Sequence, residues 1–455
     1  MKLKKFTKRL NKVIPGGAHT YSRGYDQFPS NAPEILSKGK GCYIYDNNNK
    51  KLLDYGMGLR AVNLGYANNQ IDQAAYKEIK NGNTLTRPSM IELQAAELMT
   101  KIIKSADMVK FTKNGSTAVT AAVKLARAYT GKKIILRCID HPFYSFDDWF
   151  IGSTVIKKGI PNETIKLTKT FKYNDLEGLK KIIKKYKKDI SCLVVEPAAN
   201  TCPSYEEGQN CNDCSLKSCK NKYKNKNHFL KKVQNLCKVN NIIFILDEMI
   251  TGFRWSIGGA QSFYGLSPDL STFGKAMANG FSLAAVTGKK KIMEMGSINK
   301  KGVERTFLLS TTHGAEMSAL GAFVETIKFI KKNNVIKHNW NYGERLKKAF
   351  NKLAKNFGIE KNIYMDGIAC SPFYICKDKE LKNSNEFRTL FIQEMIKNGV
   401  FMPWVAICNS HNDKTFKVTQ RALENTFKIY KKALASSPKK FIRGHIVKPV
   451  FRKYN

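Results

Sequence analysis

Short, continuous apolar runs between residues 66 and 320 limit the fold of this chain more than any other feature of its sequence. Segments with apolar residues at helical spacing separate these runs. Strands that alternate with helices form parallel sheets, and a strand buried on both faces is apolar throughout. We therefore expect an α/β fold with a doubly wound, mostly parallel sheet. The runs are MVKF (108–111), IILR (134–137), CLVV (192–195) and IIFIL (242–246).

The remainder of the 455 residues surrounds this sheet with segments of different character. The alternation of apolar and polar residues in CYIYDNNNKKLLDY predicts a hairpin, which follows an N-terminal arm in residues 1–65. Residues 66–320 form the expected large domain, with a cysteine-rich insertion at about 201–228. We expect a smaller α+β domain at 321–435, where helical stretches surround short strands, and a basic tail at 436–455.

The composition argues against a membrane protein and against a nucleic-acid-binding protein. No run approaches the roughly 20 apolar residues of a membrane span, and the basic N-terminus lacks the apolar core of a secretory signal. The formal net charge is +42, but lysines outnumber arginines about five to one and are spread along the chain. Proteins that read nucleic acid favour arginine and gather their charge on one face. We expect a cytoplasmic protein with no membrane or nucleic-acid partner.

Polar residues follow several apolar runs, at the sheet edge where open α/β sheets bind ligands. IIFIL leads into Asp247, CLVV leads into Glu196, and MVKF is followed by an Asn-Gly-Ser run (114–116) at the start of a helical stretch. Lys275 lies between small residues ahead of a turn. A lysine amine can bind an aldehyde, a carboxylate can keep a pyridine nitrogen protonated, and a helix N-terminus can bind phosphate. Together these groups indicate a site for pyridoxal phosphate (PLP).

The motifs that carry these residues resemble those of the class III, fold-type I PLP aminotransferases, and most of all the glutamate-1-semialdehyde 2,1-aminomutase branch. The resemblance covers about residues 10 to 435. It implies the PLP-dependent transferase fold of type I, with a smaller α+β C-terminal domain. The motifs are PGGAHTYSRG (15–24), KNGSTAVTAAVKLARAYTG (113–131), VVEPA (194–198), FILDEMITGFRW (244–255), DLSTFGKAMANGF (269–281) and STTHGAE (310–316).

The resemblance implies a role for each of these polar residues. Lys275 would form a Schiff base with PLP and act as the acid and base, and Asp247 would pair with the pyridinium nitrogen. Met249 would pack on one face of the ring and Phe143 on the other. The residues expected at the phosphate or the phenolic oxygen are Asn114, Gly115, Ser116, Glu196 and Thr311, the last from the partner subunit of a homodimer.

The implied activity is transfer of an amino group between an amino donor and a small, anionic carbonyl compound. Arg23, Arg60 and Arg87 are expected to bind substrate, because arginine is scarce in this chain and suits carboxylates. The phosphate loop and the STTHGAE segment depart from the aminomutase pattern, which favours an intermolecular transaminase. Two alternatives stay open: the aminomutase itself, which moves the amino group within one molecule, and, more remotely, a nucleic-acid-binding or regulatory protein on a PLP fold.

Four cysteines of the polar insertion are candidates for a metal site. Almost no apolar residue accompanies them, so a packed core does not explain them. Four thiolates bind zinc tetrahedrally, and zinc would order a loop that has no core of its own. We expect a structural zinc ion, with an iron–sulfur cluster, disulfides or free thiols as alternatives. The four residues are Cys202, Cys211, Cys214 and Cys219.

Overall fold

The computed structural model describes residues 4–198, 201–204, 215–223, 227–299 and 301–454. It divides the chain into two compact units, residues 1–68 with 337–455 and residues 69–336. The four segments expected from the sequence divide the chain differently, and their boundaries stay predictions. Within the described residues, no helix is both long enough and apolar enough to cross a membrane.

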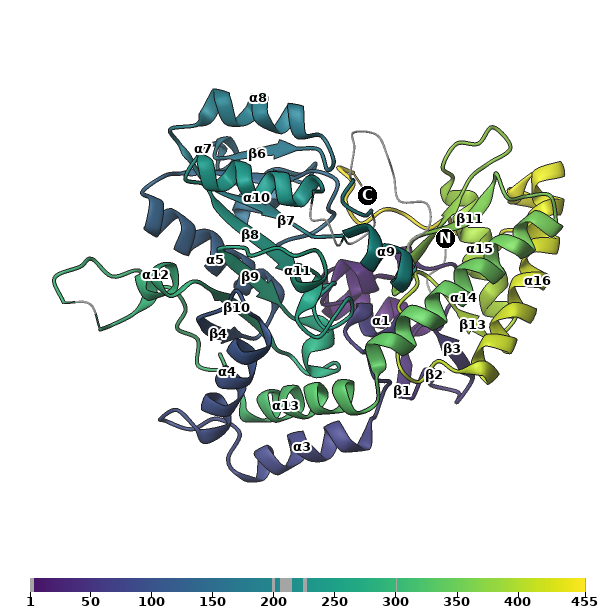
Figure 1. Ribbon diagram of the computed structural model, residues 1–455. Helices are drawn as coiled ribbons and strands as arrows, with labels where there is room; N and C mark the ends of the chain where they lie inside the picture. The colour runs from purple at the N-terminus through teal and green to yellow at the C-terminus, as the bar shows by residue number, and fades with distance from the viewer. Residues whose placement is uncertain (1–3, 199–200, 205–214, 224–226, 300, 455) are drawn as a thin grey trace. The chain divides into compact units, whose positions relative to one another are not determined.

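A seven-stranded sheet forms the centre of the 69–336 unit (Figure 1). Among its described strands, only β10 runs antiparallel to its neighbours, β4 and β9. The pairs from β9 across to β6 are all parallel, which confirms the expected mostly parallel sheet. In sheet order the strands are β4 (Met108–Thr112), β10 (Ala284–Gly288), β9 (Leu270–Phe273), β8 (Ile243–Glu248), β7 (Ile190–Val195), β5 (Ile134–Cys138) and β6 (Thr168–Phe171).

The expectation that every apolar run is a strand buried on both faces is wrong for MVKF. In β4, Met108 and Lys110 are exposed, and only Thr112 is buried. The reason is position, because β4 is an edge strand and pairs only with β10. By contrast, every residue of β5, β7 and β8 is buried.

Helices cover the sheet, and the sequence supplies a side-chain cap at the start of some of them. The longest helix against the sheet, α5 (Gly115–Thr130), packs on β7, β8, β9 and β10. Asn114 caps its start by accepting the Thr117 N–H at 2.9 Å, and Gly131 ends it with a left-handed φ of 68°. The other helices of this unit are α3 (Asn69–Lys80), α4 (Met90–Ile102), α6 (Asp148–Ile151), α7 (Asn162–Lys166), α8 (Leu176–Tyr186), α9 (Leu216–Tyr223), α10 (Phe229–Val239), α11 (Gly259–Phe263), α12 (Lys290–Met293) and α13 (Met317–Lys332).

The other unit joins the two ends of the chain. The expected hairpin is present, since β2 and β3 pair antiparallel, and β3 then pairs in parallel with β13 from the C-terminal part. A shared core, which includes Leu53, Tyr55, Phe391 and Phe427, lies between these elements. The strands are β1 (Leu36–Lys40), β2 (Tyr43–Asp46), β3 (Lys51–Asp54), β11 (Ile363–Ile368), β12 (Ser371–Cys376) and β13 (Val400–Phe401), and the helices are α1 (Lys5–Val13), α2 (Met57–Arg60), α14 (Val335–Asn356), α15 (Asn385–Lys397) and α16 (Asp413–Ala435).

Candidate active site

Strand β8 carries Asp247 into the interior, where it is 2% exposed. Its Oδ1 accepts the Met249 N–H at 2.9 Å and the Thr272 hydroxyl at 3.1 Å. Thr272 reaches it because β9 places this residue in register with Asp247. Burial raises the pKa of Asp247 to about 6, while the nearby positive charge of Lys275 acts in the opposite direction. The buried carboxylate and the lysine amine therefore share one site.

Lys275 follows β9 after one residue, Gly274, and has an unusual backbone conformation. Its φ is 44°, in the left-handed region that side chains other than glycine rarely adopt. Non-glycine residues in this region cost of order 1–3 kcal/mol and gather at functional sites. The lysine is half-buried, so its amine lies at the edge of the interior.

The start of α5 offers unpaired amide groups to an anion. The first N–H groups of a helix have no acceptor within the helix, and the Asn114 cap uses only that of Thr117. Ser116 is 6% exposed, and its Oγ accepts the Phe146 N–H at 3.2 Å, which leaves its own hydroxyl hydrogen to donate elsewhere. With Gly115, these groups form a cradle suited to a phosphate.

Met249 brings this cradle and the lysine together. A Cβ atom added to Gly115 would lie 2.7 Å from the Met249 Sδ, and one added to Gly274 would lie 2.6 Å from it. The thioether therefore packs against both glycines, and Ala118 and Ala284 complete its surroundings. Gly274, which precedes Lys275, and Gly115, at the start of α5, thus both contact the Met249 side chain.

Glu196 lies beside two residues that the sequence did not reveal. Its backbone N–H donates to His141 Nδ1 at 3.2 Å, and the Tyr144 hydroxyl donates to the same nitrogen at 2.8 Å. Burial lowers the pKa of His141 to about 3, so the ring is neutral at pH 7 and accepts both bonds. Tyr144 interacts electrostatically with both Glu196 and Asp247. The signal that could have found them is their place after β5, at the same sheet edge.

Several expected site residues lie at the surface of the 69–336 unit. Phe143 is 47% exposed, and its ring contacts Phe150 edge-on at 5.7 Å. Thr311 is exposed and its carbonyl accepts the Gly314 N–H at 3.2 Å. Arg87 is exposed between α3 and α4. The roles expected of these three residues beside Asp247 and Lys275 stay predictions.

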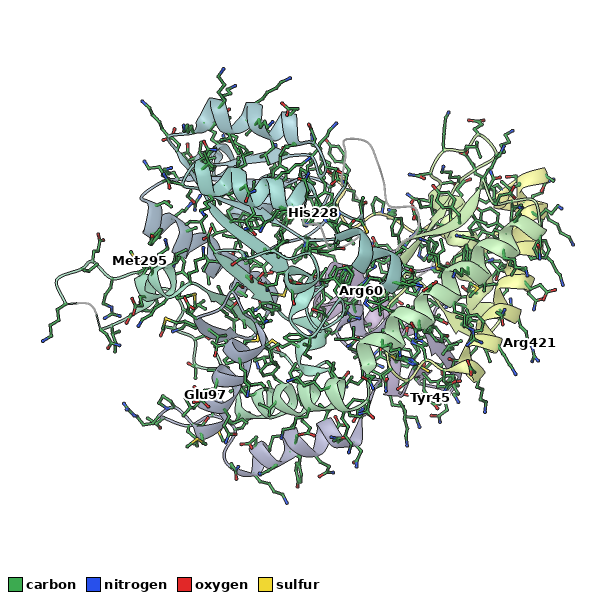
Figure 2. All side chains as sticks on the ribbon, in the orientation of Figure 1. Tyr45, Arg60, Glu97, His228, Met295 and Arg421 are labelled. Atoms are coloured by element: carbon green, nitrogen blue, oxygen red, sulfur yellow. The ribbon has the colours of Figure 1, made fainter. Side chains whose placement is uncertain are left out.

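Arg60, labelled in Figure 2, ends an unusual turn in the other unit. The φ angles of Met57, Gly58, Leu59 and Arg60 are 41°, 57°, 60° and 69°, so α2 is a single left-handed helical turn. A left-handed turn costs roughly 1–2 kcal/mol for each residue that is not glycine. Asp54 holds it: Oδ1 accepts the Gly56 N–H at 2.6 Å, and Oδ2 accepts the Met57 N–H at 2.9 Å.

The residues in the 69–336 unit fit PLP as a group. An amine suits its aldehyde, a buried carboxylate suits its ring nitrogen, and the amides at the start of α5 suit its phosphate. Because the Met249 thioether packs against Gly115 and Gly274, it contacts backbone rather than side chains at these two residues.

The expected metal ligands are only partly described. Cys202 and Cys219 are buried, at 4% and 0% exposure, whereas Cys211 and Cys214 lie outside the described residues. In the part of the chain that the structure describes, no three histidine, cysteine, aspartate or glutamate side chains gather as a metal site would require.

Comparison with known proteins identifies the family. Residues 21–202 and 221–423 match the family described as Aminotransferase class-III. The chain is 29% identical over 426 residues to the 3-aminobutyryl-CoA aminotransferase of Cloacimonas acidaminovorans, covering 93% of this chain and 95% of that protein. It is 28% identical over 442 residues to the glutamate-1-semialdehyde 2,1-aminomutase of Fusobacterium nucleatum subsp. nucleatum, covering 92% and 96%.

The fold comparison agrees with the sequence comparison. The FumI protein of Sphingopyxis sp. MTA144, solved in a PLP-containing form, superposes with a TM-score of 0.81 over 95% of this chain and 97% of that one, at 23% identity. PLP is the cofactor that this family implies, and the residues described above fit it. This chain is therefore an enzyme that belongs to the class-III aminotransferase family.

Proposed function

We propose that this enzyme moves an amino group between an amino donor and a small, anionic carbonyl compound, with PLP held by the residues around Met249. The observation that carries this proposal is the meeting of Asp247, Lys275 and the start of α5 in one buried site. Relatives named as an aminotransferase and as an aminomutase support the same chemistry.

The chain's own residues have distinct tasks in this proposal. PLP supplies a ring that withdraws electrons from the reacting carbon. The Asp247 carboxylate stays ionised opposite the ring nitrogen, because a positive partner lowers the pKa that burial raises. Lys275 Nζ would take the proton from the amino-bearing carbon of the donor and, in the second half of the transfer, deliver a proton to the former carbonyl carbon of the acceptor. Gly115 and Ser116 would hold the phosphate, and Glu196 would face the phenolic oxygen.

Borohydride reduction of the PLP-loaded protein tests the assignment of the lysine. Peptide mapping should find the label on Lys275, and Lys275→Ala should lose both the label and amino transfer. Lys289 is the matched control, because this lysine is paired with Asp269 at 2.6 Å and has no proposed role. Lys289→Ala should keep the label on Lys275. A label on another lysine of the native protein would refute the assignment.

The aminomutase is the second candidate, favoured by the relatives that carry this name. The two activities differ in what they require. A transaminase needs two substrates and stops when the amino donor is withheld, whereas an aminomutase converts a single amino-aldehyde without a donor. Isomer formation from glutamate-1-semialdehyde alone, at the rate of the full assay, would establish the aminomutase.

A homodimer with a shared phosphate site belongs to the same proposal. Its support is the exposed Thr311 in a loop that is fixed at its base, where Lys113 pairs with Glu316 at 2.5 Å just before α5. Lys275→Ala subunits mixed with Thr311→Ala subunits should regain activity, because the heterodimer has one site with both residues. Verified heterodimers without activity would exclude a shared site.

We also propose a structural zinc ion bound by Cys202, Cys211, Cys214 and Cys219. Support comes from the two described cysteines, because both are buried, at 4% and 0% exposure, and both lie near Tyr264. A reducing cytoplasm, the compartment we propose, would keep the thiolates available to zinc. Elemental analysis of the PLP-loaded protein should find about one zinc per chain. Metal-free protein with titratable thiols would refute the site, and a brown chromophore would indicate the iron–sulfur alternative.

A further inference from the structure

The segment that follows β5 makes a hydrogen-bond network with the first turns of α5. Ser145 is fully buried, and its Oγ accepts the Asp147 N–H at 3.1 Å, so the side chain closes a turn around Phe146. The same Oγ donates to the Ser116 carbonyl oxygen at 3.4 Å and lies 3.0 Å from the Thr120 Oγ1. One serine side chain thus connects this turn to two residues of the helix.

Asp147 adds a carboxylate to the network. Its Oδ2 accepts the Thr120 hydroxyl and also lies 3.3 Å from the Ser145 Oγ, which shares its hydrogen between this carboxylate and the helix carbonyl. The Trp149 Nε1–H donates to the Thr120 Oγ1 at 2.9 Å, so the single hydroxyl hydrogen of Thr120 is left for the carboxylate. Hydrogen bonds to a carboxylate are stronger than those between neutral groups. Since Thr120 lies one helical turn beyond Ser116, the network holds the turn against α5 at two levels.

This turn places the Phe146 N–H at the Ser116 hydroxyl. The N–H donates to the Ser116 Oγ at 3.2 Å. A serine in a helix often gives its hydroxyl hydrogen to a carbonyl of the preceding turn. Among the described residues, the Ser116 hydroxyl hydrogen has no such acceptor. The Ser116 Oγ therefore accepts from the turn and keeps its one hydrogen for another partner, and the oxygens of a phosphate are acceptors.

We propose that Ser145, Asp147 and Thr120 are positioning residues for the phosphate of PLP. Their network fixes the Phe146 N–H on the Ser116 Oγ and so keeps the Ser116 hydroxyl as a donor to the phosphate. The inference rests on the proposed function, which assigns the start of α5 to this phosphate. All five residues belong to the 69–336 unit, as does the candidate active site. The three positioning side chains act through Ser116 and need no contact with the cofactor.

Titration of the cofactor-free protein with PLP and with pyridoxal, which lacks the phosphate, tests the inference without turnover. Both compounds offer the same aldehyde to Lys275, so the ratio of their dissociation constants, measured by absorbance, reports on the phosphate. Ser145→Ala and Thr120→Val should each raise the PLP dissociation constant about tenfold and leave that of pyridoxal within about twofold. Thr120→Ser keeps the hydroxyl and should keep the native ratio. The hydroxyls are the residues to change, because a substitution of the carboxylate would also alter the charge near the phosphate.

Two further variants show the route by which the network acts. Thr130→Val is the matched control, because Thr130 lies at the other end of α5 and donates to the Ala126 carbonyl oxygen at 2.7 Å. It should leave both dissociation constants unchanged. In a Ser116→Ala background, Ser145→Ala should raise the PLP dissociation constant by at most about threefold, because the hydroxyl on which it acts is already absent. A further tenfold rise would show that Ser145 acts by another route and would overturn the inference.

The outcomes separate this inference from the proposed function. A native ratio in both Ser145→Ala and Thr120→Val would overturn the inference and leave the proposed function standing. An equal loss of affinity for PLP and pyridoxal would also overturn it, because the network would then serve the fold alone. If Ser145→Ala fails to fold, the comparison of Thr120→Val with Thr120→Ser decides.

Two results concern the proposed function itself. Native protein that binds PLP and pyridoxal equally would remove the phosphate site at the start of α5, and both proposals would fail. The expected change of ratio, in a protein that transfers no amino group, would refute the proposed function only.

Discussion

At the residue scale, Met249 limits which residues can replace Gly115 and Gly274. Its Sδ lies where a Cβ atom of Gly115 or Gly274 would collide with it. The thioether is flexible, so it could move aside, but it would then enter the space beside Asp247 and Lys275 that we assign to the cofactor. A larger residue at either glycine position should therefore weaken PLP binding rather than destabilise the folded protein.

This argument predicts a specific response to Gly115→Ala. The dissociation constant for PLP should rise about tenfold, because the displaced thioether competes with the ring. The free energy of unfolding of the cofactor-free protein should change by less than about 1 kcal/mol, since alanine suits the first turn of a helix. Gly115→Ala with Met249→Ala should regain PLP affinity in an absorbance titration. Unchanged affinity in the single variant would contradict the packing argument.

Asp54 predicts a pH-dependent difference in stability. Burial raises its pKa from 3.8 to about 6, so the folded state holds the proton more tightly than the unfolded state. The protonated Asp54 carboxyl contributes fully to the stability of the folded protein below pH 3.8, and this contribution is lost as the pH rises through about 6. Asp54→Asn does not ionise, so the stability advantage of the native protein over this variant should shrink by about 2.4 kcal/mol between pH 4 and pH 7. Urea unfolding of both cofactor-free proteins at the two pH values measures this, and a constant difference would exclude the raised pKa.

At the element scale, the left-handed turn α2 reverses the usual preference between alanine and glycine. In a right-handed helix alanine is more favourable than glycine by about 1 kcal/mol. Leu59 has a φ of 60°, where the Cβ atom is the source of strain. Leu59→Gly should therefore be more stable than Leu59→Ala by about 1 kcal/mol, although both lose the leucine side chain. Thermal unfolding of the two variants decides, and greater stability of the alanine variant would contradict the left-handed assignment.

The sequence allowed prediction of elements that depend on local patterns. The parallel sheet and the β2–β3 hairpin followed from apolar runs and alternation, and Asp247 and Lys275 were singled out because they come at or just after the ends of strands β8 and β9. The left-handed turn was not predictable, since distant residues contact it in addition to the neighbouring Asp54: the Trp404 Nε1–H, for example, donates to the Gly56 carbonyl oxygen at 3.0 Å. The exposure of β4 likewise depends on its place at the sheet edge.

His141 and Tyr144 show the same limit for the site. Their mutual hydrogen bond is local, but their contacts with Glu196 and Val194 connect β5 to the neighbouring β7. A buried neutral histidine of this kind has no distinctive sequence pattern. The packing of His445 and Arg452 against residues 25–30 also escaped prediction, because a basic, irregular segment gives no periodicity that indicates packing.

At the scale of the whole molecule, the residues proposed to hold PLP all belong to the 69–336 unit. Saturation with PLP at a hundredfold excess over its dissociation constant should stabilise this unit by about 2.7 kcal/mol. Hydrogen exchange should then slow about a hundredfold for the most protected amides of β7, β8 and β9, with little change in the β2–β3 hairpin. Lys275→Ala provides the control with weaker cofactor binding. Equal slowing in both units would show that they open together.

The pairing of β3 with β13 limits the order in which parts of the chain can fold during synthesis at the ribosome. Residues 1–68 emerge first but belong with residues 337–455, so they wait while the intervening unit is synthesised. At roughly 5–20 residues per second, this wait lasts tens of seconds. The tail contacts to Tyr25, Asp26 and Ser30 come from residues 445–452 and are made last. A premature stop codon would therefore release a chain in which β3 has no β13 to pair with. The N-terminal segment of such a chain should be a target for chaperones and proteases.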